Sequence, residues 1–189
     1  MPEQTVLVDL DVSAPMRDGA QLRANVYRPR DGRWPVLLTR SPYGKDLPGA
    51  ASMLDPVQAA RRGYVVIVQD TRGRFASEGE FHPFEDEARD GVDTIAWAAD
   101  LPYSDGNVGM YGASYLGFTQ WSAAVDQPPA LKALVPSVTW CDPLNGMSFR
   151  GGALELGTIA HWGLQMGFDL LARRHAGEPA TAGAKCQPR

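Results

Sequence analysis

The sequence predicts an α/β fold whose sheet is largely parallel and opens on an antiparallel hairpin. This prediction rests on three observations. Strand and helix patterns alternate along most of the chain, as in sheets with helical crossovers. Residues 64–68 form a continuous apolar, β-branched run, which is typical of a strand buried on both faces. Residues 6–12 and 21–27 have the character of two strands, and the turn signal Met16–Gly19 between them indicates a hairpin.

The other elements follow in chain order: strands at 35–38, 108–111 and 131–135, and helices at 85–99, 115–125 and 154–171. On the helix at 85–99, apolar residues at helical spacing predict the buried face: Ala88, Val92, Ile95, Ala96 and Ala99. The acids Glu85, Asp86 and Glu87 stand at its start, where the helix dipole favours negative charge. We expect these acids to be solvated.

The composition is that of a soluble globular protein: 189 residues, 44% hydrophobic and 21% charged, enough to bury one core. The net charge of −4 is spread along the chain, which argues against nucleic acid or an anionic membrane as the main partner. No apolar run approaches transmembrane length. The two cysteines, Cys141 and Cys186, are far apart and lack metal-ligand spacing. We therefore expect a cytoplasmic location, with no metal and no cofactor.

The hypothesis of a catalytic serine begins at residues 112–117, Gly-Ala-Ser-Tyr-Leu-Gly. This run lies between a predicted strand and a predicted helix, where α/β serine hydrolases present their nucleophile on a sharp turn. The generic Gly-x-Ser-x-Gly pattern expects glycine at Leu116, whereas the glycine stands at 117. The local sequence leaves two interpretations open: Ser114 is a nucleophile, or Ser114 caps an ordinary helix.

Several segments taken in order resemble the cocaine esterase family of serine hydrolases, which is related to the X-Pro dipeptidyl peptidases. These segments are Met16–Gly19, Ser41–Lys45, Gln69–Gly73 with Ala76–Phe81, Asp105–Met110 and Gly112–Gly117. The family's own motif, Gly-x-Ser-Tyr-x-Gly, accounts for Leu116 and Gly117. The resemblance runs from Val12 to Phe168. It implies the N-terminal part of an α/β-hydrolase core at 1–140 and the start of a helical cap at 141–175.

The resemblance also implies roles for four residues. Ser114 would attack the carbonyl carbon of a small-molecule ester or related acyl substrate, giving an acyl-enzyme that water hydrolyses. The backbone N–H of Tyr115 and the hydroxyl of Tyr43 would stabilise the charge on the carbonyl oxygen. Trp162, on the predicted cap helix, would line the acyl pocket, although plain packing of that helix explains it nearly as well.

The histidine and carboxylate that complete a serine triad are not identified in the sequence. In the family both follow the helical cap, and this chain ends at Arg189. The three histidines, His82, His161 and His175, match no catalytic position, so we expect this chain alone to hydrolyse esters poorly. Two alternatives stay open: an aminopeptidase of the X-Pro dipeptidyl peptidase type, and a catalytically inert truncated remnant or binding module.

Three further expectations concern the surroundings of the motif. Asp70 and Arg72, at the end of a buried strand, are predicted to form a structural ion pair. Residues 176–189 lack periodicity and are predicted to be a disordered tail. In a chain that ends at Arg189, the strand 131–135 would be an open sheet edge, which predicts self-association through that edge.

Overall fold

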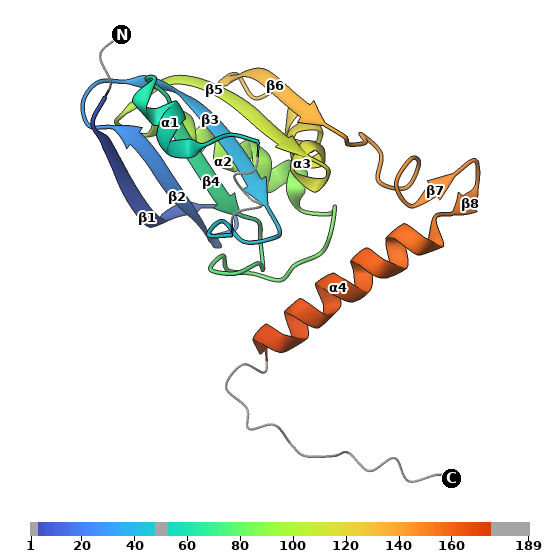
Figure 1. The fold of residues 1–189 in the computed structure, drawn as a ribbon. Coiled ribbons are helices and arrows are strands. Elements are labelled where there is room, and N and C mark those ends of the chain that lie inside the picture. The colour runs from blue at the N-terminus through green and yellow to red at the C-terminus, as the bar shows by residue number, and fades with distance from the viewer. Residues whose placement is uncertain (1–3, 48–52, 175–189) are drawn as a thin grey trace, which may run out of the picture. The chain divides into compact units, whose positions relative to one another are not determined.

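The computed structural model describes residues 4–47 and 53–174. The chain divides into two compact units, residues 1–141 and 142–189. The first unit contains a six-stranded sheet with the order β1-β2-β4-β3-β5-β6 (Figure 1). Its strands are β1 (Val6–Pro15), β2 (Gln21–Pro29), β3 (Trp34–Ser41), β4 (Val65–Asp70), β5 (Ser104–Ala113) and β6 (Leu131–Ser137). The prediction of an α/β sheet is confirmed.

The parallel strands β3, β4, β5 and β6 bring the four segments that follow them to one edge of the sheet. β1 and β2 form the predicted antiparallel hairpin, and β2 pairs antiparallel with β4. β3 pairs parallel with both β4 and β5, and β5 pairs parallel with β6. The chain moves from β3 to β4 on one side and then crosses to β5 on the other, so the strand order reverses at β3. In open α/β sheets, ligands bind at the carboxyl ends of the strands beside such a reversal.

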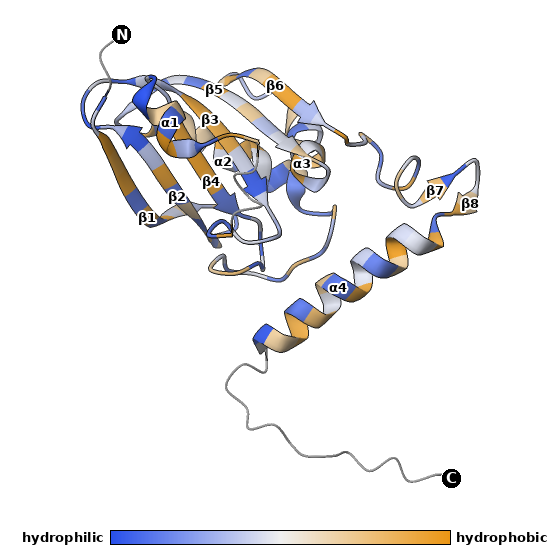
Figure 2. Cartoon of the chain, viewed as in Figure 1, coloured by the Kyte–Doolittle hydropathy of each residue, from blue (hydrophilic) through white to orange (hydrophobic). Residues whose placement is uncertain are grey.

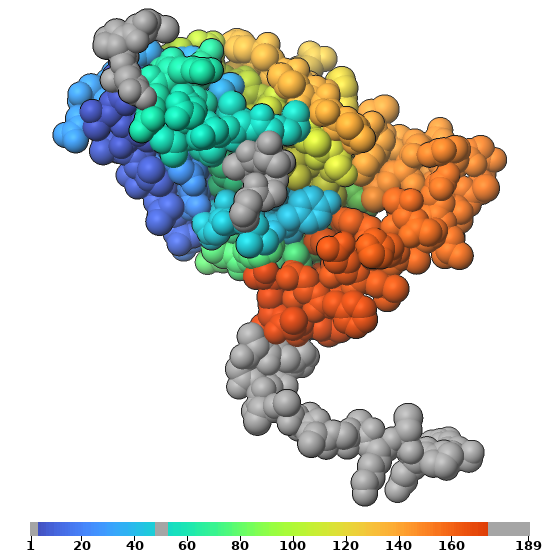
Figure 3. Space-filling model, in the orientation of Figure 1, coloured from blue at the N-terminus to red at the C-terminus, as the bar shows by residue number. Residues whose placement is uncertain are grey.

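Helices cover both faces of the sheet (Figure 1). α1 (Pro56–Arg61) lies on one face, and α2 (Glu87–Asp100) and α3 (Tyr115–Ala124) lie on the other. Figure 3 shows atoms of α1 covering part of the near face of the sheet. In the main core, Val36, Leu38, Ile67, Val108 and Met110 of the sheet are buried together with Ile95 and Ala98 of α2 and Ala123 of α3. In a smaller cluster, Val66, Val68 and Tyr111 of the sheet pack with Ala59 of α1.

The buried face of α2 differs from the predicted one. Its buried residues are Glu87, Asp90, Gly91, Thr94, Ile95 and Ala98. Of the predicted apolar face only Ile95 is fully buried, and Ala96 is exposed. Glu87, which we expected to be solvated, is only 4% exposed. The helix is rotated from the apolar pattern because its carboxylates meet arginines of the sheet and of a neighbouring loop.

The second unit contains a short hairpin and a long helix. β7 (Phe149–Arg150) and β8 (Ala153–Leu154) pair antiparallel, and α4 (Leu156–Arg174) follows. Hydrophobic and hydrophilic residues alternate along α4 (Figure 2), and four of its large apolar side chains are exposed: Leu156, Leu164, Phe168 and Leu171. The division into a core and a cap stays a prediction, and the predicted disordered tail lies outside the described residues.

Within the described parts of the chain, no helix combines the length and the apolar character needed to cross a bilayer.

The close approach of α2 and α3 gives a testable prediction. A methyl group added at Gly91 would lie 2.7 Å from Cβ of Ala123. We therefore expect Gly91→Ala to lower the free energy of unfolding by roughly 1–3 kcal/mol through overpacking. Gly163→Ala is the matched control, because no heavy atom lies within 4 Å of the added carbon. There the better helix propensity of alanine should raise stability by up to about 1 kcal/mol. Urea unfolding of both variants checks this, and equal effects would contradict the packing.

Candidate active site

Ser114 lies on a sharp turn between β5 and α3, in a backbone conformation that residues other than glycine rarely adopt. Its φ is 56° and its ψ is −122°. Two hydrogen bonds hold the turn, one to the last residue of β6 and one from the segment that follows β6. The N–H of Ser114 donates to the carbonyl of Ser137 at 2.9 Å, and the hydroxyl of Thr139 donates to the carbonyl of Ser114 at 2.7 Å. Such strain persists only where neighbouring contacts determine it.

Two glycines make this turn possible. Gly112 has a φ of 150°, and a Cβ there would lie 2.4 Å from Cβ of Leu116. A Cβ at Gly117 would lie 2.7 Å from Cβ of Thr139, the residue whose hydroxyl holds Ser114. Glycine at position 117 therefore leaves room for the side chain of Thr139. Likewise, the absence of a side chain at Gly112 leaves room for the leucine at position 116. This explains in physical terms why the motif departs from the generic pattern.

The structure brings Tyr43 next to Tyr115. Tyr115 is the first residue of α3 and is buried. The N–H groups of a helix's first turn find no acceptor within the helix. Tyr43 follows β3, the neighbour of β5, and its ring meets the ring of Tyr115 edge-on with centroids 6.5 Å apart. Both lie at the carboxyl edge with Ser114, but their catalytic roles stay predictions. Trp162 lies half-buried on α4 of the second unit, and its role also stays a prediction.

The loop that carries Tyr43 is tied to the loop after β4. Asp70 is fully buried and accepts hydrogen bonds from the N–H of Lys45 at 2.6 Å and of Ala76 at 3.3 Å. Nε of Arg74, also buried, donates to the carbonyl of Pro42 at 2.7 Å. Burial raises the pKa of Asp70, and the N–H and ammonium groups of Lys45 partly oppose that shift.

The predicted ion pair between Asp70 and Arg72 is wrong. Arg72 instead binds Asp90 through two hydrogen bonds, of 2.9 and 2.7 Å, and approaches Asp18 at 2.9 Å. The carboxylate of Asp70 lies 3.5 Å from Nζ of Lys45. β4 ends at Asp70, so Arg72 lies beyond the strand and reaches α2 rather than its sequence neighbour.

A buried charged cluster, Arg40–Glu87–Tyr115, lies beside the turn at Ser114. Nη1 of Arg40 is 2.8 Å from Oε2 of Glu87. The hydroxyl of Tyr115 donates to Oε1 of Glu87 at 2.9 Å and accepts from the N–H of Phe84 at 3.1 Å. Burial raises the pKa of Glu87, whereas the charge of Arg40 opposes the shift. Burial, followed by the nearby charge of Glu87, raises the pKa of Tyr115.

Aromatic rings surround the side chain of Tyr115, an arrangement that the sequence did not predict. The centroid of its ring lies 5.0 Å from that of Phe84, 6.0 Å from that of Phe118 and 6.3 Å from that of Phe81. Trp140 stacks on Phe118 at 6.5 Å. These rings come from three separate segments of the chain, so no local motif contains them. They give the turn an apolar setting.

No histidine is hydrogen-bonded to Ser114 within residues 4–47 and 53–174. The exposed ring of His82 lies 3.6 Å from Glu80 and 3.7 Å from Asp86. His161 is exposed on α4, and His175 lies outside the described residues. In the same part of the chain, no three His, Cys, Asp or Glu side chains are grouped as a metal ion would require.

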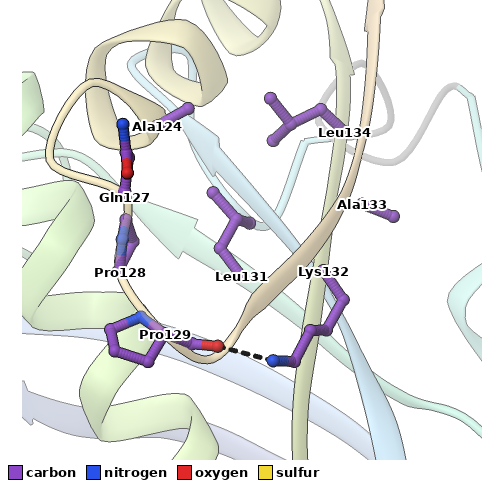
Figure 4. Close-up of a pocket in the computed structure, with 8 residues that line it drawn as sticks. All are labelled: Ala124, Gln127, Pro128, Pro129, Leu131, Lys132, Ala133 and Leu134. Carbon is purple, nitrogen blue, oxygen red and sulfur yellow. Dashed lines mark hydrogen bonds between the residues drawn. The ribbon is translucent and has the colours of Figure 1, made fainter.

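A hollow of about 390 Å³ lies at the start of β6, away from this site (Figure 4). It is lined by Ala124, Gln127, Pro128, Pro129, Leu131, Lys132, Ala133 and Leu134. Within it, Nζ of Lys132 donates to the carbonyl of Pro129 at 2.7 Å. β6 begins at Leu131 and ends at Ser137, where Ser114 is bound. The hollow is therefore at the opposite end of the strand and is not part of the candidate site.

Comparison with known proteins shows similarity along most of the chain. The family described as X-Pro dipeptidyl-peptidase (S15 family) matches residues 18–188. Cocaine esterase of Rhodococcus sp. (strain MB1 Bresler) is 43% identical over 176 residues, which cover 91% of this chain and 31% of the esterase. The chain thus spans about a third of the length of this curated relative.

Solved structures confirm the α/β-hydrolase fold. A CocE/NonD family hydrolase from Staphylococcus aureus superposes with a TM-score of 0.79 and 31% identity, covering 93% of this chain and 34% of that one. An aminopeptidase from a marine sediment Thaumarchaeota archaeon gives a TM-score of 0.70 and 27% identity, covering 87% and 30%.

The lowered pKa values of two aspartates near the site predict how the stability of the fold depends on pH. The hydrogen bond from Arg72 lowers the pKa of Asp18, and that from the Asn25 amide lowers the pKa of Asp46. A group with a lowered folded pKa stabilises the fold above its unfolded value, about 3.9, and this stabilisation is lost as pH falls through the folded pKa. We expect Asp18→Asn to be less stable than the parent at neutral pH, with the difference shrinking below about pH 4. Thermal unfolding from pH 2.5 to 7 checks this; a constant difference would contradict it.

Proposed function

Because the chain belongs to the X-Pro dipeptidyl-peptidase (S15) family, we propose that it is a serine hydrolase that cleaves ester or related acyl bonds of small molecules through an acyl-enzyme on Ser114. The observation that carries this proposal is the backbone of Ser114. A serine that merely caps a helix has an extended backbone, and its hydroxyl accepts from an N–H of the first turn. Ser114 has a positive φ and makes no such capping bond. This geometry favours the nucleophile over the cap.

The proposed reaction follows from groups at the carboxyl edge. Oγ of Ser114 bonds to the carbonyl carbon while the π electrons move onto the oxygen. The carbonyl then re-forms from the tetrahedral species, and the alkoxide leaves as the alcohol with the proton that Ser114 gave to the base. Water attacks the acyl-enzyme in the same way, which releases the acid and restores the serine hydroxyl. The N–H of Tyr115 and the hydroxyl of Tyr43 stabilise the oxyanion, and one such donor is typically worth about 3 kcal/mol. The base that accepts the serine proton is not among the contacts of Ser114 in the described residues.

An ester is the favoured substrate class. The relative with 43% identity is named cocaine esterase, whereas an aminopeptidase is among the more distant structures. An X-Pro dipeptidyl peptidase must also hold a free amino terminus, usually with acidic residues. In the first unit, the buried carboxylates of Asp70, Glu87 and Asp90 are already paired with basic side chains. This favours the esterase over the aminopeptidase. The role of Trp162 in the acyl pocket and a cytoplasmic location stay predictions.

Substitution at the site tests the proposal in the full gene product. We expect Ser114→Ala to abolish hydrolysis of p-nitrophenyl esters and covalent labelling by a fluorophosphonate. The control is Ser122→Ala, further along α3, which should retain both ester hydrolysis and fluorophosphonate labelling.

Tyr43→Phe should lower kcat by about 100- to 1000-fold, as for loss of one oxyanion donor. Activity that survives Ser114→Ala would contradict the proposal. A full gene product that is neither active nor labelled would favour the inert binding module.

We also propose that the 189-residue chain self-associates through β6. Val135 is 57% exposed on this edge, and β5 is the only strand that pairs with β6 among the described residues. The edge is partly blunted, because the buried amide of Gln120 bonds the N–H of Val135 at 3.0 Å and its carbonyl at 3.4 Å. We expect an oligomer in size-exclusion chromatography with light scattering. Val135→Lys should restore the monomer, and Val125→Lys, 76% exposed at the end of α3, should not. A monomer at all concentrations would contradict this proposal.

A further inference from the structure

Glu87 holds the residue that follows the proposed nucleophile. Its carboxylate takes a hydrogen bond from the hydroxyl of Tyr115 at 2.9 Å and pairs with Arg40 at 2.8 Å. We infer that Glu87 is a positioning residue, which fixes Tyr115 through its side chain and thereby aims the N–H of Tyr115 at the developing oxyanion. This inference rests on the proposed function.

The burial of the cluster supports a role in positioning. The exposed fractions are 0% for Arg40, 4% for Glu87 and 1% for Tyr115, so no member exchanges its partner for bulk water. A buried ion pair often stabilises a fold no better than apolar side chains of similar volume. Its hydrogen bonds are nevertheless directional, and charge-assisted bonds are roughly twice as strong as neutral ones. The cluster therefore restricts the orientation of Tyr115 more than apolar packing does.

Both proposed oxyanion donors depend on this one cluster. Arg40 is on β3, three residues before Tyr43, and Tyr115 opens α3. The rings of Tyr43 and Tyr115 meet edge-on. The hydroxyl of Tyr115 also accepts from the N–H of Phe84, a residue with a φ of 72°. Displacement of the Tyr115 ring would therefore disturb the loop at Phe84 and the support of Tyr43 together.

A second tyrosine provides a matched control for a purely structural role. Tyr111 lies three residues before Ser114 on β5 and is 7% exposed. Within the described residues its buried hydroxyl has no hydrogen-bond partner. Tyr111→Phe and Tyr115→Phe thus delete the same group on either side of the nucleophile, and only the second deletion breaks hydrogen bonds.

The experiment compares Tyr115→Phe, Glu87→Gln and Tyr111→Phe in the full gene product, each with a far-UV circular dichroism spectrum that matches the parent. Misplaced catalytic groups can cost up to about a hundredfold in rate, so we expect Tyr115→Phe to lower kcat by about 10- to 100-fold. KM should change less than about threefold, as for an interaction made mainly in the transition state. An arylboronic acid forms an adduct with serine that resembles the tetrahedral species. Its binding affinity should therefore fall by about the same factor as kcat. Tyr111→Phe should leave all three unchanged, and Glu87→Gln should follow Tyr115→Phe.

The outcomes separate this inference from the proposed function. Loss of activity in Ser114→Ala with unchanged kcat and boronate affinity in Tyr115→Phe would overturn the inference alone. Survival of activity in Ser114→Ala would overturn the proposed function. A lower melting temperature with unaltered kcat would make the cluster structural only, and failure of both Tyr115→Phe and Glu87→Gln to fold would also overturn the positioning role.

Discussion

The charge of Arg40, buried on the central strand, is the constraint on which the carboxyl edge of the sheet depends. A guanidinium that is removed from water must be paired and hydrogen-bonded within the protein. Gln69 of β4 accepts from its Nε at 2.9 Å, and Glu87 of α2 supplies the opposite charge. Asp90, one turn further along α2, lies 3.8 Å from its Nη2 and binds Arg72 on its other side. One buried charge thereby fixes the start of α2 and the loop after β4.

Four of the six non-glycine residues with positive φ in the described part of the first unit lie at the same edge. Phe75, Phe84, Ser114 and Val138 all have positive φ values, and each follows the end of a parallel strand. Such conformations cost about 1–3 kcal/mol each, and they persist where the surroundings leave no alternative. At two of these positions the restraint is visible: the hydroxyl of Tyr115 holds the N–H of Phe84, and Thr139 holds the carbonyl of Ser114. The other two of the six, Asp11 at a register shift in β1 and Gln127 after α3, lie elsewhere, so the loops around the candidate site hold most of this strain.

Prediction from the sequence succeeded for elements with a strong local pattern. It failed where contacts between residues far apart in the chain determine the structure. The buried run of β4 and the strand–helix turn at Ser114 are local signals, and both lie where they were expected. α1 escaped prediction because its six residues are too few to show helical periodicity, although Asp55 caps it. The prediction of the buried face of α2 was wrong because the spacing of apolar residues cannot show that Glu87 contacts Arg40, 47 residues earlier in the chain. Tyr43 was found only through the family resemblance, since nothing in its own segment points to Tyr115.

The restraint of Ser114 by Thr139 has a consequence for synthesis of the protein. The two residues are 25 positions apart, and Thr139 follows β6. On the ribosome the chain grows from its N-terminus, so Ser114 is made before the groups that hold it. Until β6 docks beside β5, the hydrogen bonds that join Ser114 to Ser137 and Thr139 cannot form, so the turn lacks the contacts that hold it. The strained backbone of Ser114 therefore forms only after this part of the sheet has assembled, which places the turn late in the folding of the first unit.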